Sequence, residues 1–172
     1  MNLILVLHNI RSTYNVGSIL RTADGLGVSE VIFSGYTPRV DDARELPHLR
    51  EKLNKQIAKT ALGAERYVKQ YVTDDIKCEL VKLKNDGFII AGLENNLDTK
   101  KPVLQMKLAN LSQIRSALDS DVVLMLGEEV NGIENSLYDV IDVFLEIPMV
   151  GRKESFNVSI ATGIACYILR EL

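Results

Sequence analysis

The stretch EIPMVGRKESFNVSIATGIACYILREL, residues 146–172, ends a strand, passes through a polar turn and opens a long apolar helix. Three polar side chains crowd the predicted first turn of this helix, Ser155, Asn157 and Ser159, with Ser155 as the expected N-cap. One capping residue is enough to begin a helix, so this cluster predicts that the turn also holds a small molecule. The helix body repeats an apolar residue at every fourth position from Ile160, as core-facing helices do, so a capped core helix is the competing interpretation.

A strand, a helix and a second strand follow one another at the start of the chain. Residues 3–7 (LILVL) form the continuous apolar run that is typical of a strand covered on both faces. The polar turn at 8–15 leads into a helix that Gly25 and Gly27 end, and residues 28–34 supply the next strand. This β-α-β order predicts two parallel strands in one sheet.

The rest of the chain continues the alternation of strands and helices, with polar segments at 35–49 and 94–105. We expect further strands at 67–72, 88–93, 121–126 and 143–147. We expect further helices at 50–62, from a cap at Thr73 and Asp74 to Gly87, and at 133–140. With no internal repeat and no linker, this order predicts one α/β domain with a parallel sheet over residues 1–172.

The composition excludes several classes of protein. With 172 residues, 47% hydrophobic and 25% charged, the chain fits a single soluble domain. No apolar run reaches the roughly 18 to 20 residues of a membrane span, so we expect no membrane contact. Cys78 and Cys166 lack the spacing of metal ligands and indicate reduced thiols of a cytoplasmic protein without a metal site. The net charge of −3 argues against a general nucleic-acid coat but leaves room for a local basic patch.

A second polar cluster opens the helix after the first strand. Asn15, Gly17 and Arg21 lie there, at the edge where parallel sheets bind ligands. Gly17 inside a helix costs roughly 1 kcal/mol relative to Ala, which indicates the close approach of another backbone or a partner. A helix cap at Asn15 and a solvated Arg21 are the alternative interpretation.

A third cluster is the turn GEEVNG, residues 127–132, which follows the strand at 121–126 directly. Its terminal glycines let the backbone bend closely around a ligand, and Glu129 can accept hydrogen bonds from a ligand or an arginine. The turn lacks the Lys-Ser/Thr ending of a phosphate-binding loop, and the chain lacks the dinucleotide fingerprint GxGxxG. An acidic surface turn is the alternative interpretation.

Together these three stretches resemble the three motifs of the SpoU-type (TrmH-like) RNA 2′-O-ribose methyltransferases of the SPOUT superfamily. The first motif, NxGxxxR, is matched by Asn15, Gly17 and Arg21. The second, GxExxG, is matched by Gly127, Glu129 and Gly132. The third, IPM followed by SLNVSxA, is matched at 147–149 and 155–161, with Phe156 in place of Leu. The order and separation of the motifs agree across nearly the whole chain.

The resemblance implies a fold, a cofactor and an assembly. It implies a parallel-sheet α/β knot, in which the segment from about residue 88 onward forms a C-terminal trefoil knot. It implies S-adenosyl-L-methionine as the methyl donor and a homodimer in which each active site draws on both chains. The donor would be bound by Leu93, Gly127, Ile147, Met149, Ser155 and Val158. The catalytic group would comprise Asn15, Arg21, Glu129, Ser155 and Asn157.

The implied reaction places few chemical demands on the protein. A sulfonium methyl group is already activated, so transfer to a ribose 2′-hydroxyl requires mainly alignment and removal of one proton. An arginine base is difficult, because its side chain stays protonated up to about pH 12. We therefore expect Arg21 to orient the hydroxyl and stabilise charge.

The implied substrate is tRNA or rRNA. Because the chain starts directly at its first strand, it resembles minimal family members with no separate RNA-binding domain. Local basic residues would then hold the RNA: Arg11, Arg39, Arg44, Arg50, Lys52 and Lys55. A solvated charged helix is the alternative for these residues, and a non-catalytic RNA-binding protein of the same fold is the alternative for the chain.

Overall fold

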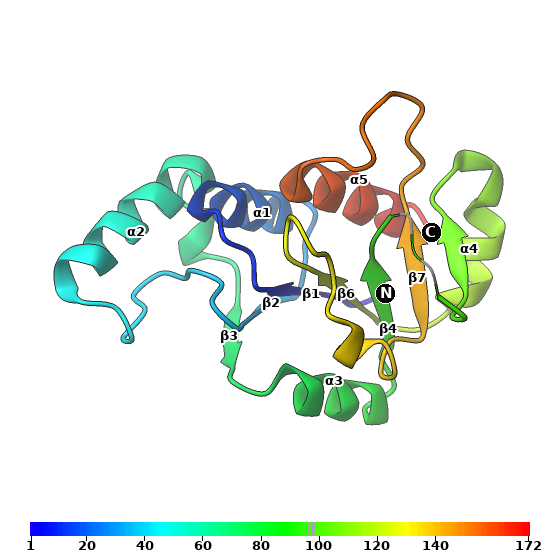
Figure 1. The fold of residues 1–172 in the computed structure, drawn as a ribbon, viewed down its shortest axis with the longest axis horizontal. Coiled ribbons are helices and arrows are strands. Elements are labelled where there is room, and N and C mark those ends of the chain that lie inside the picture. The colour runs from blue at the N-terminus through cyan, green and yellow to red at the C-terminus, as the bar shows by residue number, and fades with distance from the viewer. Residues whose placement is uncertain (96, 98) are drawn as a thin grey trace.

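A seven-stranded parallel sheet forms the centre of the computed structural model, which describes residues 1–95, 97 and 99–172 (Figure 1). The strands are β1 (Leu3–His8), β2 (Glu30–Ser34), β3 (Gln70–Thr73), β4 (Ile89–Leu93), β5 (Val103–Gln105), β6 (Val122–Leu126) and β7 (Val143–Glu146). They run in the order β3-β2-β1-β6-β4-β7-β5, and every pairing is parallel. The predicted α/β class with a parallel sheet is confirmed.

Helices cover both faces of this sheet (Figure 1). They are α1 (Thr13–Gly25), α2 (Pro47–Ala61), α3 (Ile76–Asn85), α4 (Leu111–Ala117) and α5 (Val158–Arg170), with short 3₁₀ turns at η1 (Ala64–Arg66), η2 (Leu108–Asn110) and η3 (Asn135–Leu137). Leu5 and Leu7 of β1 pack in the core with α1, α4 and α5, whereas Ile4 and Val6 pack in the core with α3. Every residue of β1 is therefore buried, which explains its continuous apolar run.

The carboxyl ends of the central strands lie side by side. Leu126 at the end of β6 is in register with Leu7 of β1 and with Leu93 of β4. Leu93 is in turn in register with Leu145 of β7. The polar turns that follow these strands therefore emerge at one edge, which is where open parallel sheets bind their ligands.

Gly17 brings α1 and α2 together at short range. A Cβ at this position would overlap the backbone carbonyl of Ile57 and the hydroxyl of Thr60, both in α2. The close approach that this glycine predicts is thus made by a neighbouring helix of the same chain. Any larger residue would push α2 away from the first turns of α1.

The start of α5 differs from the prediction in a way that matters for the site. Asn157, not Ser155, is the N-cap, and its Oδ1 accepts the N–H of Ser159 at 2.9 Å. Ser155 therefore lies in the turn before the helix and is free to face a ligand. Asn and Ser cap helices about equally well, so the sequence alone did not decide between them.

Other boundaries also differ from the predictions. α2 begins at Pro47, three residues earlier than predicted, because proline suits the first turn of a helix. The predicted helix at 133–140 contains only the turn η3, and the polar segment at 94–105 contains the three-residue strand β5. Of the two cysteines, Cys78 is exposed and Cys166 is buried, and burial raises the pKa of Cys166 to about 12.

Candidate active site

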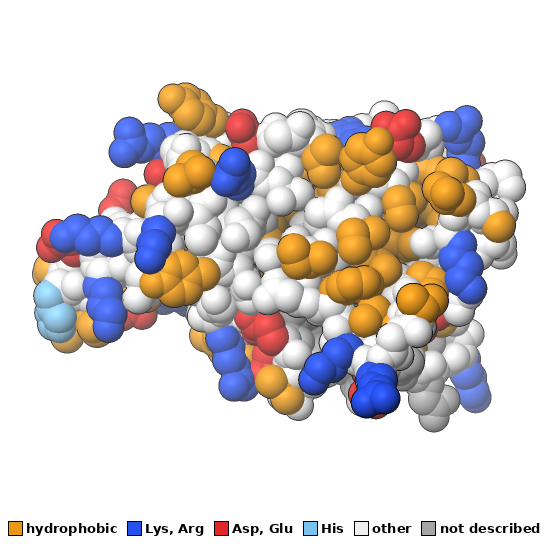
Figure 2. Space-filling model, turned by 90° about the horizontal axis from the view of Figure 1, so that it is seen from above, with side chains coloured by type: hydrophobic (Ala, Val, Ile, Leu, Met, Phe, Trp, Pro, Cys, Tyr) orange, Lys and Arg blue, Asp and Glu red, His pale blue; other side chains and the backbone are white. Residues whose placement is uncertain are grey.

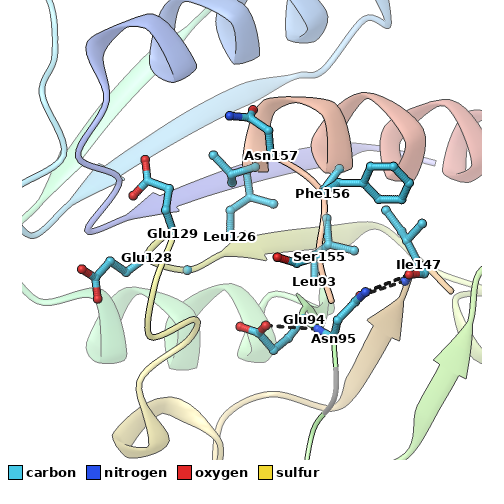
Figure 3. A pocket seen from close by; sticks show the side chains of 13 residues that line it. Leu93, Glu94, Asn95, Leu126, Glu128, Glu129, Ile147, Ser155, Phe156 and Asn157 are labelled. Carbon is cyan, nitrogen blue, oxygen red and sulfur yellow. Dashed lines mark hydrogen bonds between the residues drawn. The ribbon is translucent and has the colours of Figure 1, made fainter. Parts of the chain in front are cut away.

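A cavity of about 160 Å³ opens at the carboxyl ends of β4, β6 and β7, next to the first turn of α5 (Figure 3). Its apolar lining consists of Leu93, Leu126, Ile147, Phe156, Val158 and Ala161. Its remaining lining consists of Glu94, Asn95, Gly127, Glu128, Glu129, Ser155 and Asn157. A largely apolar cavity with a few convergent polar groups is typical of a small-molecule site.

The turn at 127–132 forms one wall of the cavity, and its glycines are required by the backbone path. The N–H of Glu128 donates to the carbonyl of Gly132 at 3.0 Å, and the N–H of Gly132 donates back at 2.9 Å. Gly132 has φ +69°, a left-handed conformation that favours glycine. A Cβ on Gly127 would overlap the backbone of Gly132 and Ile133. The turn can therefore close tightly only with glycine at both ends.

Glu94 holds this turn in place from the end of β4. Its carboxylate accepts the backbone N–H of Ile133 at 3.0 Å and that of Asn95 at 3.1 Å. A Cβ on Gly132 would overlap the same carboxylate. Glu94 thus fixes the wall that carries Glu128 and Glu129.

Asn95 holds the opposite wall. Its Nδ2 donates to the carbonyl of Ile147 at 2.8 Å, and its Oδ1 accepts the N–H of Ile147 at 3.1 Å (Figure 3). The same Nδ2 donates to the carbonyl of Glu154 at 3.2 Å. Neither Glu94 nor Asn95 is among the residues predicted for the site. Their position directly after the predicted strand at 88–93 was the available signal, since polar residues there lie at the ligand-binding edge of a parallel sheet.

A hydrogen-bond network joins the three predicted motifs. Asn15 Nδ2 donates to Glu129 Oε1 at 3.2 Å, and Asn157 Nδ2 donates to Asn15 Oδ1 at 3.2 Å. Glu129 also accepts the backbone N–H groups of Arg11 at 3.1 Å and Ser12 at 3.3 Å. Residues far apart in the chain are thus held as one unit at the mouth of the cavity.

These contacts keep Glu129 ionised. Burial by itself would raise the pKa of this carboxyl group, but hydrogen bonds from the backbone of Arg11 and from the Asn15 amide outweigh it, and the pKa is lowered. Glu129 is therefore an acceptor at neutral pH and cannot donate a proton. The neighbouring Glu128 is paired with Arg11.

The structure brings most of the predicted site residues to this cavity. Of the predicted donor-binding residues, Leu93, Gly127, Ile147, Ser155 and Val158 line it. Met149 does not; it lines a neighbouring hollow together with Pro148, Gly151 and Arg152. Met149 belongs to the irregular segment 147–157, where no strand or helix period indicates the direction of a side chain.

Of the predicted catalytic residues, Glu129, Ser155 and Asn157 line the cavity, and Asn15 is hydrogen-bonded to two of these. Arg21 is not brought to the cavity by this single chain. It lies on the exposed side of α1, nearly two turns after Asn15, and is not among the described residues that line the cavity. In the part of the chain that the structure describes, no group of three His, Cys, Asp or Glu side chains is placed to hold a metal ion. Likewise, none of the helices at 1–95, 97 and 99–172 is long and apolar enough to cross a membrane.

The predicted RNA-binding residues fall into separate groups. Arg39 and Arg44 both pair with the buried carboxylate of Asp42, at 3.2 and 2.6 Å. Arg50 donates to the backbone carbonyl of Glu45 at 3.1 Å. Lys52 and Lys55, in contrast, line a groove on the surface of α2.

Comparison with known proteins identifies the family. The sequence model of the SpoU rRNA Methylase family matches residues 2–167, nearly the whole chain. The chain belongs to this SpoU family. The resemblance seen in the three motifs is therefore confirmed.

Relatives of this SpoU chain agree with the assignment. A Staphylococcus aureus protein whose name assigns it to the TrmH family of tRNA/rRNA methyltransferases is 29% identical over 168 residues, which cover 97% of this chain and 58% of that protein. A relative from another Staphylococcus aureus strain, with the same name, is 30% identical over 95% of this chain and 56% of its own length. The chain thus spans a little over half the length of these relatives.

Solved structures of similar proteins share the fold. The A. aeolicus TrmH/SpoU tRNA modifying enzyme has a TM-score of 0.73 and 25% identity, covering 99% of this chain and 74% of that one. An rRNA methyltransferase of Sinorhizobium meliloti, solved with AdoMet bound, has a TM-score of 0.76 and 20% identity, covering 99% of this chain and 56% of that one. At 20% identity the similarity concerns the fold alone.

Proposed function

We propose that this protein transfers a methyl group from S-adenosyl-L-methionine to a ribose 2′-hydroxyl of tRNA or rRNA. The observation that carries the proposal is the junction of Asn15, Glu129 and Asn157 at the mouth of one cavity. These residues come from the three SpoU motifs, and Glu129 and Asn157 reach Asn15 from 114 and 142 positions away in the sequence. Membership of the SpoU family supports the same activity.

The lining of the cavity fits S-adenosyl-L-methionine. The apolar side chains of Leu93, Leu126 and Ile147 suit the flat adenine ring, and the carboxylates of Glu94 and Glu128 suit the positive charges and hydroxyls of the donor. Ser155 and the backbone of Gly127 supply further polar contacts. When bound, the donor supplies a methyl group activated by a sulfonium centre.

The chain's own polar residues would then position the ribose. The ionised Glu129 orients the Asn15 amide, and Asn157 holds the other end of that amide. An amide fixed at both ends presents its remaining hydrogen-bonding capacity in one direction, as the alignment of a hydroxyl group requires. Ser155, displaced from the helix cap, is the candidate contact between donor and ribose.

A homodimer would supply the missing arginine. Three large apolar side chains near the start and along the outer side of α5 are exposed, Phe156 by 40%, Ile160 by 54% and Tyr167 by 59%. Figure 2, which views the molecule from above Figure 1 and so from the side of α5, shows that apolar side chains gather on this face. Such a surface is typical of a protein interface. Because α1 packs beside α5, an interface here would carry the partner subunit's Arg21 toward the cavity.

Two further expectations belong with this proposal. The C-terminal trefoil knot stays a prediction, supported by the SpoU membership and by the packing of the 127–132 and 147–155 turns around one cavity. A cytoplasmic location would place the enzyme with tRNA and rRNA.

The test is to incubate the protein with methyl-labelled S-adenosyl-L-methionine and total RNA, and to measure both donor binding and label in RNA. We expect saturable binding and transfer to RNA. Donor binding without transfer to any RNA, or no donor binding at all, would favour the non-catalytic RNA-binding alternative.

A further inference from the structure

A second hollow lies beside the candidate active site, between the first turn of α1 and one face of α2. Its volume is about 410 Å³, and its lining includes Tyr14 from α1 together with Lys52, Lys55 and Lys59 from α2. The three lysines recur at intervals of three and four residues, so they share one face of the helix. We call this hollow the α2 groove.

The α2 groove is basic although the chain as a whole is acidic. Its one carboxylate, Glu51, is paired with Lys55 at 2.6 Å, and the Lys59 ammonium lies 5.8 Å from the centre of the Tyr14 ring. The net charge of the chain is −3. Lys and Arg side chains nevertheless gather over the lobe that α2 forms at the left of Figure 2. This local excess of positive charge favours an anionic ligand.

The two walls of the groove are fixed to each other. Thr60 Oγ1 donates to the backbone carbonyl of Tyr14 at 2.9 Å, and Thr13 Oγ1 donates to Gln56 Oε1 at 3.1 Å. Gly17 lets the helices approach closely one turn further on. The ring of Tyr14 is 43% exposed and is therefore held at a defined place without being buried.

The groove is also fixed relative to the site of methyl transfer. Tyr14 directly precedes Asn15, whose amide is bonded to Glu129 and Asn157. The α2 groove and the hydrogen-bonded network of Asn15 therefore share the first turn of α1. Under the proposed function, the polymer that binds next to the α2 groove is the RNA substrate.

We propose that the α2 groove seats a single-stranded nucleotide next to the one being methylated, with its base on Tyr14 and its phosphate on Lys52 and Lys59. This inference rests on the proposed function. An exposed aromatic ring surrounded by cations is the arrangement with which proteins bind unpaired nucleotides, since the ring stacks on the base and the cations contact the backbone. A protein partner fits less well, because lysine is depleted at the centre of protein interfaces.

The test compares two RNAs of equal length, an oligouridylate and the same ribose-phosphate chain without bases, by fluorescence anisotropy. Tyr14→Leu should weaken binding of the oligouridylate roughly tenfold, within the range of one lost stack, and leave the abasic chain unaffected. Lys52→Gln should weaken both and lower the slope of log affinity against log salt by about 0.7, the value of one phosphate contact. Both variants should raise KM for RNA more than they lower kcat.

Lys82→Gln is the matched control, because Lys82 is an exposed helical lysine on α3, on the other face of the sheet. Lys82→Gln should leave the affinities for the oligouridylate and for the abasic chain unchanged. Equal losses for both RNAs in Tyr14→Leu, or unchanged binding in Tyr14→Leu and Lys52→Gln, would overturn the proposal even if methyl transfer continues. Absence of methyl transfer in the unaltered protein would instead refute the proposed function. Donor affinity and melting temperature, measured on each variant, separate these outcomes from misfolding.

Discussion

Asn157 Nδ2 donates a hydrogen bond to Asn15 Oδ1 at 3.2 Å, across 142 residues of sequence. The same Asn157 caps α5 through its Oδ1, and the same Asn15 is bonded to the ionised Glu129. One side chain thus fixes the start of a helix and one end of the proposed catalytic network. The geometry of the network is therefore coupled to the fold of the C-terminal segment.

We predict that Asn15→Ala lowers kcat for methyl transfer on the order of a hundredfold, because the ribose loses an oriented amide. Donor affinity should change little, since Asn15 does not line the cavity. Steady-state kinetics and calorimetric titration of the donor measure the two effects. Asn85→Ala, at the exposed end of α3, is the control and should match the unaltered protein.

Arg21→Ala should abolish methyl transfer while donor affinity stays within a few fold, because Arg21 is outside the cavity of its own chain. Equal loss of both would assign Arg21 to binding or folding.

Mixing two inactive variants tests whether Arg21 acts across a dimer. In a mixture of Arg21→Ala and Asn157→Ala chains, about half of the dimers are mixed, and each mixed dimer has one complete site if Arg21 comes from the partner. We therefore expect about a quarter of the unaltered activity after the subunits exchange. Activity no greater than that of the separate variants would place Arg21 in its own chain's site or exclude the dimer.

Gly132→Ala should prevent donor binding. The left-handed φ of +69° disfavours a side chain, and the new Cβ would overlap the Glu94 carboxylate that holds the turn. Gly151→Ala is the control, because a Cβ there meets nothing within 4 Å. Calorimetric titration of the donor should show no binding for the first variant and unchanged binding for the second. Normal affinity in Gly132→Ala would mean that this turn does not shape the donor site.

Asp42→Asn should destabilise the protein by about 1.5–3 kcal/mol at pH 7, since both Arg39 and Arg44 lose a buried ionic partner. The side-chain hydrogen bond from Arg44 lowers the pKa of Asp42 below its ordinary value of 3.8 despite its burial. Because the pKa of Asp42 is lower in the folded protein, its charge stabilises the fold at any pH above the ordinary pKa. This stability is lost as the pH falls through the lowered, folded-state pKa.

Urea unfolding at several pH values measures this effect. The difference between Asp42→Asn and the unaltered protein should be constant near neutrality and shrink below pH 3.8. Asp139→Asn, which removes an exposed pair with Lys77, should have little effect at any pH. A difference that persists unchanged in acid would show that the Asp42 charge is not the source of the stability.

The sequence predicted the sheet and its central strands because runs such as residues 3–7 and 122–126 are apolar throughout, as is typical of strands covered on both faces. It also predicted three motifs whose residues do meet, at Asn15, Glu129 and Asn157. It missed β5 because three residues are too few to show a period.

The details of the site were beyond the sequence for specific reasons. Ser155 and Asn157 are equally good caps, and only the packed turn decides which of them begins α5. Glu94 and Asn95 act on backbone groups about forty and fifty residues away, at Ile133 and Ile147, which no local pattern records.

The most direct test of the central claim is the position of the transferred methyl group. RNA methylated by the protein with labelled S-adenosyl-L-methionine is digested to nucleosides, and the labelled nucleosides are separated and identified by mass spectrometry. We predict that the label lies on the ribose, as 2′-O-methylnucleosides, and that Asn157→Ala removes it. Label on a base would contradict the account.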